Sequence, residues 1–337
     1  MGERAKLLEI QILRGVAALA VVFVHIGIDL RYWGKVDIGW TDAGNAGVDL
    51  FFVISGFIMV YIAWDRFGVP GAPADFFIRR LIRIVPLYWI VTTGYLLLNS
   101  YPASRIITSY LFLPDPGADA AKLPVILQGW TLNFEMFFYA TLALALFLPR
   151  LAALCCVSAL MAGIVLLRVP YYGSTIVLEF VLGLWIGFAY CKQVCLSPAA
   201  RIAVITLGAV AIVATVFLPP QDRLLTFGIP AALIVAGAVL GTPIPGTRVV
   251  RALVLLGDAS YALYSTHPLM TRLCATSLRH LVGLDQGPQQ TLYILVALAA
   301  SVTLALVIHL AVERPITTGL QRLWARRGVA TAPAHRV

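Results

Sequence analysis

Apolar positions along the 337-residue chain gather into runs of about 20 residues that are separated by mostly short polar segments. A helical run of this length matches the ~30 Å hydrocarbon core of a bilayer. Unpaired backbone groups are too costly in lipid, so each run is expected to be an α-helix. We therefore predict an all-α polytopic membrane protein with about ten transmembrane helices, at residues 10–30, 46–64, 82–98, 131–148, 151–169, 174–191, 202–218, 224–241, 255–281 and 291–312.

The residue composition supports membrane insertion. The chain is 60% hydrophobic and 12% charged, whereas soluble domains are about 45–50% apolar and about 25% charged. The ten runs leave no length for a separate soluble domain. We therefore expect one membrane domain at residues 1–316, followed by a cytosolic basic tail at residues 317–337 whose end is disordered.

The placement of basic residues predicts the orientation of the spans. If the N-terminus is cytosolic and the runs alternate, the inside segments hold 16 of the 25 lysines and arginines and the outside segments hold seven. Cytosolic loops of membrane proteins carry such an excess. We therefore predict a multi-pass protein with both termini in the cytoplasm. The net charge of +9 then reflects topology, and no nucleic-acid partner is expected.

The first apolar run carries two ionisable residues, Arg14 and His25. Ionisable groups at membrane depth are costly and commonly functional. Eleven residues advance a helix by roughly 16 Å and through about three turns, so the two side chains share one face. Arg14 is close enough to the cytosolic boundary to snorkel. His25 is not, and a hydrogen-bonded structural histidine is the alternative to a functional one.

Three carboxylates occur at a similar depth in other runs. Asp49, Glu135 and Glu179 each lie a short distance inside the outer end of a predicted span, so chain direction puts them in one layer with His25. A histidine base with carboxylates that orient it is suited to removing a proton from a hydroxyl group. A proton-coupled transporter could contain the same groups, so this layer alone does not separate the two classes.

A basic cluster precedes the third run. In FFIRRLIRIVPLYW, Arg80 and Arg83 lie at i and i+3 on one helix face, and Arg79 points elsewhere. Two guanidinium forks at a helix mouth suit phosphate binding, although positive-inside anchoring also explains them. His309, near the cytosolic end of the last run, stands alone. The five cysteines show no metal-ligand spacing, so no metal site is predicted.

At these residues the chain resembles the acyltransferase-3 family of integral membrane acyltransferases, and within it the bacterial exopolysaccharide O-acetyltransferases of the succinoglycan type. The opening helix EIQILRGVAALAVVFVHI carries the family's Arg-x10-His pair at Arg14 and His25, and Arg80 and Arg83 match its Arg-x-x-Arg. The resemblance runs from residue 9 to about residue 316, through GNAGVDLFFVISGFIM, GWTLNFEMFFY, VLEFVLGLWIG, LGDASYALYSTHP and ERP. One block is a weak match, whereas all of them in this order are a strong one.

The resemblance implies an activity. It implies that an acyl group, expected to be acetyl, passes from cytosolic acyl-CoA to a hydroxyl of a cell-surface or exported polysaccharide or glycolipid. The implied location is a bacterial inner membrane. One rival interpretation is a transporter or flippase for a lipid-linked glycan, and another is an acyltransferase that acts on a small molecule other than a glycan. The chain shows no internal repeat of the kind common in transporters, which argues against the first rival. The oligomeric state stays open.

The resemblance also implies roles for individual residues. The basic residues expected to hold acyl-CoA as co-substrate are Arg14, Arg80 and Arg83. His25 is the expected general base, with Glu135 or Asp49 fixing its tautomer, and an acyl-histidine intermediate is the alternative to direct transfer. The secondary candidates are Glu179, Tyr264 and His267. For His267, a structural position at the kink beside Pro268 is the alternative.

Overall fold

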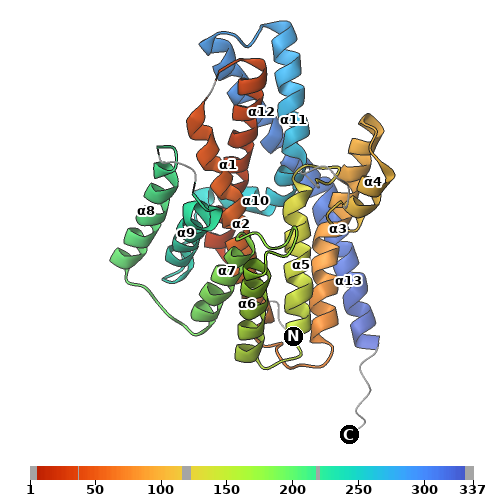
Figure 1. The fold of residues 1–337 in the computed structure, drawn as a ribbon, viewed down its shortest axis with the longest axis vertical. Coiled ribbons are helices and arrows are strands. Elements are labelled where there is room, and N and C mark those ends of the chain that lie inside the picture. The colour runs from red at the N-terminus through yellow and green to blue at the C-terminus, as the bar shows by residue number, and fades with distance from the viewer. Residues whose placement is uncertain (1–5, 37, 116–122, 218–220, 331–337) are drawn as a thin grey trace.

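The computed structural model describes residues 6–36, 38–115, 123–217 and 221–330, and these ranges contain helices and no strand (Figure 1). The all-α prediction is therefore confirmed for the described part of the chain. In chain order the helices are α1 (Leu8–Trp33), η1 (Gly39–Asn45), α2 (Ala46–Ala63), α3 (Ala72–Leu98), α4 (Ala103–Tyr110), α5 (Gly129–Ala145), α6 (Arg150–Leu166), α7 (Val177–Cys191), α8 (Pro198–Ala214), η2 (Leu224–Gly228), α9 (Ile229–Val239), α10 (Arg248–Asp258), α11 (Ser260–Leu281), α12 (Gly287–Ile308), η3 (His309–Glu313) and α13 (Arg314–Ala330).

Each of the ten predicted runs overlaps a helix, but within the described ranges four helices are long and apolar enough to cross a membrane. These four are Leu8–Trp33, Gly39–Ala63, Ala72–Leu98 and Gly287–Arg326. The helices α5, α6, α7 and α8 have only 15 to 17 residues. The run 224–241 forms the short helix Leu224–Val239, and the run 255–281 is divided at Ala259 between α10 and α11. The count of ten spans is therefore not confirmed, because turns shorten or divide runs that look continuous in the sequence.

Two helices extend beyond the runs that predicted them. α3 begins at Ala72, where Gly71 has a φ of +79° and Pro73 occupies the first turn, so the basic cluster lies inside the helix. α12 continues through η3 into α13, so the domain boundary predicted at residue 316 falls within a helix. The predicted disordered end at residues 331–337 and the middle of the loop PDPGADAAKLP, residues 116–122, lie outside the described residues.

The helix α1 is central to the arrangement and contacts α2, α9, α10, α11 and α12. In Figure 1, α11 and α12 stand beside α1 in the upper part of the molecule, whereas α3, α5 and α13 form a group in the lower part. α3 contacts α5, α11 and α13. Side chains from α1, α2, α3, α5 and α11 can therefore reach one internal space, although these helices are far apart in the sequence.

Glycines permit the close contact between α2 and α7. A Cβ atom on Gly56 would lie 2.1 Å from the carbonyl oxygen of Phe180, and one on Gly183 would lie 1.9 Å from that of Val53. Only glycine fits at such distances, and small residues are the usual means by which membrane helices approach one another. This contact holds α2, which carries Asp49 and Ser55, inside the helix bundle.

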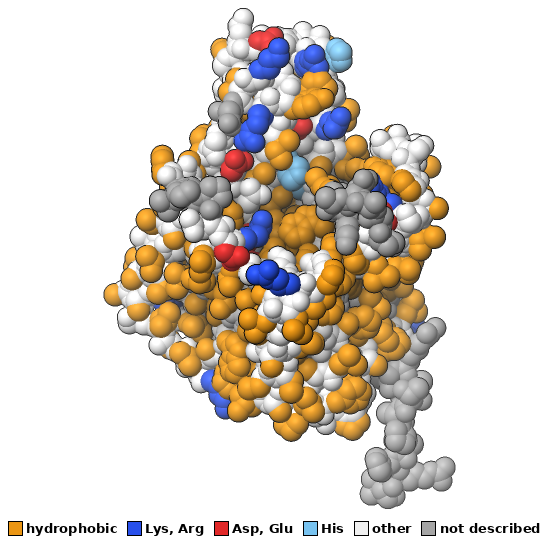
Figure 2. Space-filling model, viewed as in Figure 1, with side chains coloured by type: hydrophobic (Ala, Val, Ile, Leu, Met, Phe, Trp, Pro, Cys, Tyr) orange, Lys and Arg blue, Asp and Glu red, His pale blue; other side chains and the backbone are white. Residues whose placement is uncertain are grey.

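The surface is divided between apolar and charged regions. Figure 2 shows hydrophobic side chains over much of the lower part, charged side chains mainly in the upper part, and a hollow near the boundary between them. Among the large apolar side chains that are exposed, Leu97, Leu144 and Leu166 are 82%, 69% and 81% exposed. Apolar exposure on this scale suits contact with lipid and indicates a membrane protein.

Candidate active site

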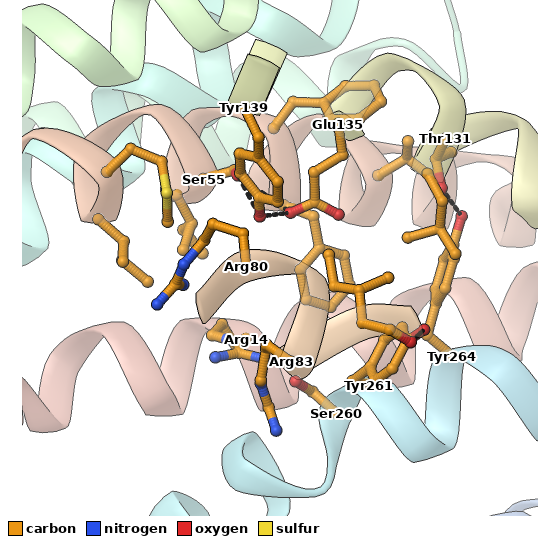
Figure 3. A pocket seen from close by; sticks show the side chains of 18 residues that line it. Arg14, Ser55, Arg80, Arg83, Thr131, Glu135, Tyr139, Ser260, Tyr261 and Tyr264 are labelled. Carbon is orange, nitrogen blue, oxygen red and sulfur yellow. Dashed lines mark hydrogen bonds between the residues drawn. The ribbon is translucent and has the colours of Figure 1, made fainter. Parts of the chain in front are cut away.

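Two helices direct three arginines into one cavity. Arg14 comes from α1, Arg80 and Arg83 come from α3, and all three line a cavity of about 130 Å³ inside the helix bundle (Figure 3). Arg79 turns away from the cavity, and its Nε donates to Asp75 at 3.0 Å. The i, i+3 spacing of Arg80 and Arg83 thus brings both into one space, and α1 adds Arg14.

Two of these arginines lack a close anionic partner. Among the described residues, no hydrogen bond or ion pair holds the guanidinium group of Arg14 or Arg80, and Nε of Arg80 is buried without a hydrogen-bond partner. Burying a cation without hydrogen bonds or a counter-ion is costly. The cavity therefore favours an anionic ligand.

Arg83 is held by a residue from the far end of the chain. Its Nη1 donates to Oε1 of Glu313 at 2.5 Å, and Oε2 of Glu313 lies 2.8 Å from Nδ1 of His309. His309 and Glu313 are the first and last residues of η3, a π-helical turn, and such turns frequently occur at functional sites. The expectation that His309 stands alone is wrong, because it bonds the Glu313 of the ERP block.

Glu135 lies on the wall of the arginine cavity. Its Oε1 accepts a hydrogen bond from Ser55 at 3.0 Å and another from Tyr139. Figure 3 shows Glu135 between the arginines at one end of the cavity and Thr131 at the other. The carboxylate interacts electrostatically with Arg14 and Arg80, so it partly offsets their charge.

His25 is partly exposed and does not line the arginine cavity. Its Nε2 lies 2.9 Å from the side-chain nitrogen of Gln128. Its Nδ1 lies 3.0 Å from the carbonyl oxygen of Val21 and 3.2 Å from Nε2 of His267. The two imidazole rings are nearly perpendicular, with centroids 4.7 Å apart. The structure thus joins His25 to the secondary candidate His267, and it adds Gln128, which the sequence did not indicate.

The expected pairing of His25 with Glu135 or Asp49 is not formed. Among the described residues, the hydrogen bonds of both carboxylates go elsewhere. Gln128 immediately precedes α5, and Glu135 lies seven residues further along, or roughly 10 Å. Residues counted inward from the ends of the apolar runs predicted that Glu135 lies at the same depth as His25. In the structure, the start of α5 lies at that depth instead.

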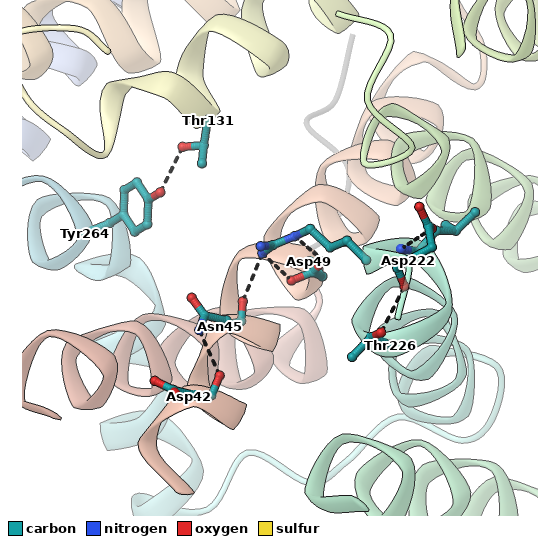
Figure 4. A network of polar contacts seen from close by, with 9 residues as sticks. Asp42, Asn45, Asp49, Thr131, Asp222, Thr226 and Tyr264 are labelled. Carbon is teal, nitrogen blue, oxygen red and sulfur yellow. Dashed lines mark hydrogen bonds and ion pairs between the residues drawn. The ribbon is translucent and has the colours of Figure 1, made fainter. Parts of the chain in front are cut away.

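Asp49 and Glu179 belong to a separate buried cluster around Arg223. Oδ1 of Asp49 accepts from Nε of Arg223 at 2.9 Å and Oδ2 accepts from Nη2 at 2.8 Å. Figure 4 shows Asp49 in a network that continues through Asn45. Glu179 is fully buried and interacts electrostatically with Asp49. The predicted layer of one histidine and three carboxylates is therefore divided among separate sites.

A hydrogen bond between Thr131 and Tyr264 lies between the arginine cavity and the two histidines. The two hydroxyl oxygens are 2.9 Å apart, and both residues line the cavity (Figures 3 and 4). Oγ1 of Thr131 also lies 2.9 Å from the backbone oxygen of Gln128. The ring of Tyr264 is 6.1 Å from that of His267. Thr131 thus connects the lining of the arginine cavity to Gln128, the residue whose side chain contacts His25.

Comparison with known proteins identifies the family. No solved structure matches the chain. The chain is 35% identical over 310 residues to the exopolysaccharide production protein ExoZ of Rhizobium meliloti (strain 1021), which covers 85% of this chain and 93% of that protein. It is 26% identical over 379 residues to the acyltransferase MdmB of Streptomyces mycarofaciens, covering 95% of this chain and 93% of that protein. It is also 31% identical over 156 residues to the putative membrane-bound transacylase BcsY of Komagataeibacter xylinus, covering 41% of this chain and 36% of that protein.

The family model described as an acyltransferase domain, Acyl_transf_3, matches residues 7–310. This range contains the three cavity arginines and both histidines of the pair. Because the match takes in most of the chain, the protein belongs to the acyltransferase-3 family, as the sequence resemblance predicted.

Proposed function

We propose that this protein is an integral membrane O-acyltransferase that moves an acyl group, expected to be acetyl, from cytosolic acyl-CoA to a hydroxyl of an exported or cell-surface polysaccharide or glycolipid. Membership of the acyltransferase-3 family supports the reaction class. The relative from Rhizobium meliloti is named as an exopolysaccharide production protein, which supports a glycan acceptor.

The arginine cavity suits the donor. Coenzyme A carries phosphate groups at its nucleotide end, and guanidinium forks bind phosphate through paired hydrogen bonds. Arg14 and Arg80 have donors free for such bonds, and the remaining lining is mostly apolar and aromatic, which suits a pantetheine arm and an acyl group. In this proposal the three arginines hold the donor so that its acyl end points past Thr131 and Tyr264.

His25 then acts as the general base. The acceptor hydroxyl first takes the place of the Gln128 amide at Nε2 of His25. As the hydroxyl oxygen bonds to the acyl carbon, its proton passes to this nitrogen. The carbon–sulfur bond of the thioester breaks next, and the imidazolium returns the proton to the departing thiolate. The products are a glycan ester and the free thiol of coenzyme A, with His25 restored to its neutral form. The partial exposure of His25 supports its contact with an acceptor.

The proposed orientation separates the two substrates. With both termini in the cytoplasm of a bacterium and the protein in its inner membrane, the Arg14 end of α1 faces the cytosol and the His25 end faces outward. Acyl-CoA would enter from the cytosol, and the glycan would approach His25 from the other side. One donor molecule would then extend along the face of α1 that Arg14 and His25 share.

The observation that carries the proposal is the pair of unpartnered arginines in a cavity whose lining includes Thr131, which bonds Gln128, the residue next to His25. We would reconstitute the purified protein in liposomes with labelled acetyl-CoA and a polysaccharide acceptor. The expected result is label bound to the glycan as a base-labile ester, with little in His25→Ala. Movement of an unmodified glycan would instead indicate the transporter, and label found only on a small molecule would indicate the non-glycan acyltransferase.

A further inference from the structure

The hydrogen bonds of His267 determine which of its nitrogens carries hydrogen. Nδ1 of His267 lies 2.9 Å from the carbonyl oxygen of Leu263. A carbonyl oxygen only accepts, so this nitrogen must be the donor. A neutral imidazole has one N–H group, so Nε2 of His267 bears a lone pair. That lone pair is directed at Nδ1 of His25, at 3.2 Å.

The protonation of His25 follows from that of His267. Nδ1 of His25 faces two acceptors, the carbonyl oxygen of Val21 at 3.0 Å and Nε2 of His267. Both contacts require hydrogen on Nδ1, so Nε2 of neutral His25 bears the lone pair. The side-chain nitrogen of Gln128, an amide donor, lies 2.9 Å from that nitrogen. All four contacts therefore agree with one arrangement, in which each neutral ring carries its hydrogen on Nδ1.

Burial distinguishes the two histidines. His267 is 0% exposed, whereas His25 is partly exposed, so only His25 can meet an acceptor that arrives from outside. The nearest acidic residue on α1, Asp29, accepts a hydrogen bond from Tyr293 at 2.9 Å. The carbonyl of Val21 is also the α-helical acceptor for the backbone N–H four residues on, that of His25. His267 is therefore the side chain placed to receive the Nδ1 hydrogen.

We propose that His267 is a positioning residue for the acyl transfer. By accepting the Nδ1 hydrogen of His25, it keeps the lone pair of His25 on Nε2, where the acceptor hydroxyl loses its proton. It also stabilises the imidazolium that forms, because Nδ1–H of a charged ring donates more strongly than that of a neutral ring. The inference rests on the proposed function, in which His25 is the general base, and it assigns the hydrogen-bond partner that Glu135 and Asp49 do not supply.

The position of the hydrogen can be measured on the wild-type protein without substrate, and a variant is needed only to assign the signals. The full chain contains five histidines, so a lipid-reconstituted sample labelled with ¹⁵N-histidine gives few signals, and a His25→Gln sample identifies those of His25. Near neutral pH, solid-state NMR should show Nδ1 of His25 protonated and Nε2 unprotonated. A His25 that carries its hydrogen on Nε2 would overturn the proposal whether or not the protein transfers acyl groups.

Two conservative variants separate positioning from packing. The amide of Gln extends to the place of Nε2, whereas the shorter Asn reaches only the place of Nδ1. His267→Gln should therefore still offer an acceptor to His25 and keep kcat within about fivefold of the wild type. His267→Asn can still bond Leu263 but not His25, and its kcat should fall roughly ten- to a hundredfold.

The donor KM should be unchanged in both variants, because neither touches the arginine cavity. Equal losses of kcat in His267→Gln and His267→Asn, or a wild-type kcat in His267→Asn, would show that His267 only fills space. If His25→Ala keeps its activity, His25 is not the general base and that part of the proposed function fails. The NMR measurement tests the tautomer independently of activity, so the two failures can be distinguished.

Discussion

Arg83 on α3 and Glu313 on η3 are separated by 230 residues in the sequence, yet they form an ion pair at the arginine cavity. The side chain of Glu313 is 1% exposed and that of Arg83 is 25% exposed, so the pair is buried at its acidic end and more open at its basic end. A buried carboxylate needs such a partner. The pair therefore fixes the direction in which Arg83 points.

The first prediction follows from this ion pair. Glu313→Gln keeps the shape of the side chain but removes its charge, so Arg83 loses its fixed direction. The donor KM should rise by about tenfold while kcat changes little, as measured by initial rates at saturating acceptor. Asp75→Asn is the matched control, because it frees Arg79, which does not line the cavity. A donor KM that falls in Glu313→Gln would mean that Glu313 competes with the donor for Arg83.

The second prediction concerns the guanidinium groups themselves. Lysine keeps the charge but lacks the planar fork, so Arg80→Lys and Arg83→Lys should each raise the donor KM roughly ten- to a hundredfold and leave the acceptor KM nearly unchanged. Arg79→Lys should leave both values unchanged, because Arg79 bonds Asp75 outside the cavity. Unchanged donor affinity in the first two variants would reduce these arginines to anchors of membrane topology.

The third prediction is the orientation in the membrane. Single cysteines placed at Asp119 and Ala330 in a cysteine-free background should react with an impermeant maleimide from opposite sides. Position 119 should react only from outside and position 330 only from the cytosol, because the basic residues gather in the segments assigned to the cytosol. Labelling of position 119 from the cytosol, or of position 330 from outside, would exclude the proposed topology.

The fourth prediction concerns the hydrogen bond between Thr131 and Tyr264. Tyr264→Phe keeps the ring, which packs against Phe51 with centroids 5.8 Å apart, and removes only the hydroxyl. The end of the cavity should then open more easily to water, so acyl-CoA hydrolysis without acceptor should increase several-fold. Thiol release in the absence of glycan measures this reaction. Tyr261→Phe is the control, since its hydroxyl bonds Ile84 instead, and equal hydrolysis in the two variants would contradict the prediction.

Residues that act along one helix were the easiest to predict from the sequence. Helical spacing put Arg80 and Arg83 on one face and turned Arg79 away, and the structure has this arrangement. The apolar runs marked helices for the same reason, since period and composition are local properties. Their number as membrane spans was harder to predict, because one turn at Ala259 divides a run without changing its hydropathy.

Contacts between distant helices could not be predicted in this way. Gln128 precedes α5 in a segment without helical period, and nothing in its sequence surroundings indicates that it meets His25. Glu313 was visible only as part of the ERP block, and its partner on α3 depends on how α3 and η3 pack. The depth of Glu135 was misjudged because the ends of an apolar run do not show how far neighbouring helices are shifted along their axes.

The last prediction separates the two residues that share a face of α1. His25→Ala should leave the protein inserted and donor binding largely intact, but it should lower turnover by ~10²–10⁴, the usual contribution of a positioned acid–base group. His25→Asn and His25→Gln should not restore the rate, because neither amide takes up a proton near neutral pH. His280→Ala is the matched control, since His280 is exposed on α11 and should not affect the rate.

Arg14→Ala should behave differently from His25→Ala, because Arg14 lines the donor cavity and His25 does not. We expect weaker donor binding together with a lower rate, measured as acyl-CoA affinity and glycan acylation at matched membrane expression. In the wild type the rate should also rise with pH as the imidazole of His25 loses its proton, and this rise should be absent from the residual activity of His25→Ala. A His25→Ala protein that acylates glycan at nearly the wild-type rate would leave the histidine with a structural role only, and the base would have to be another group near Gln128.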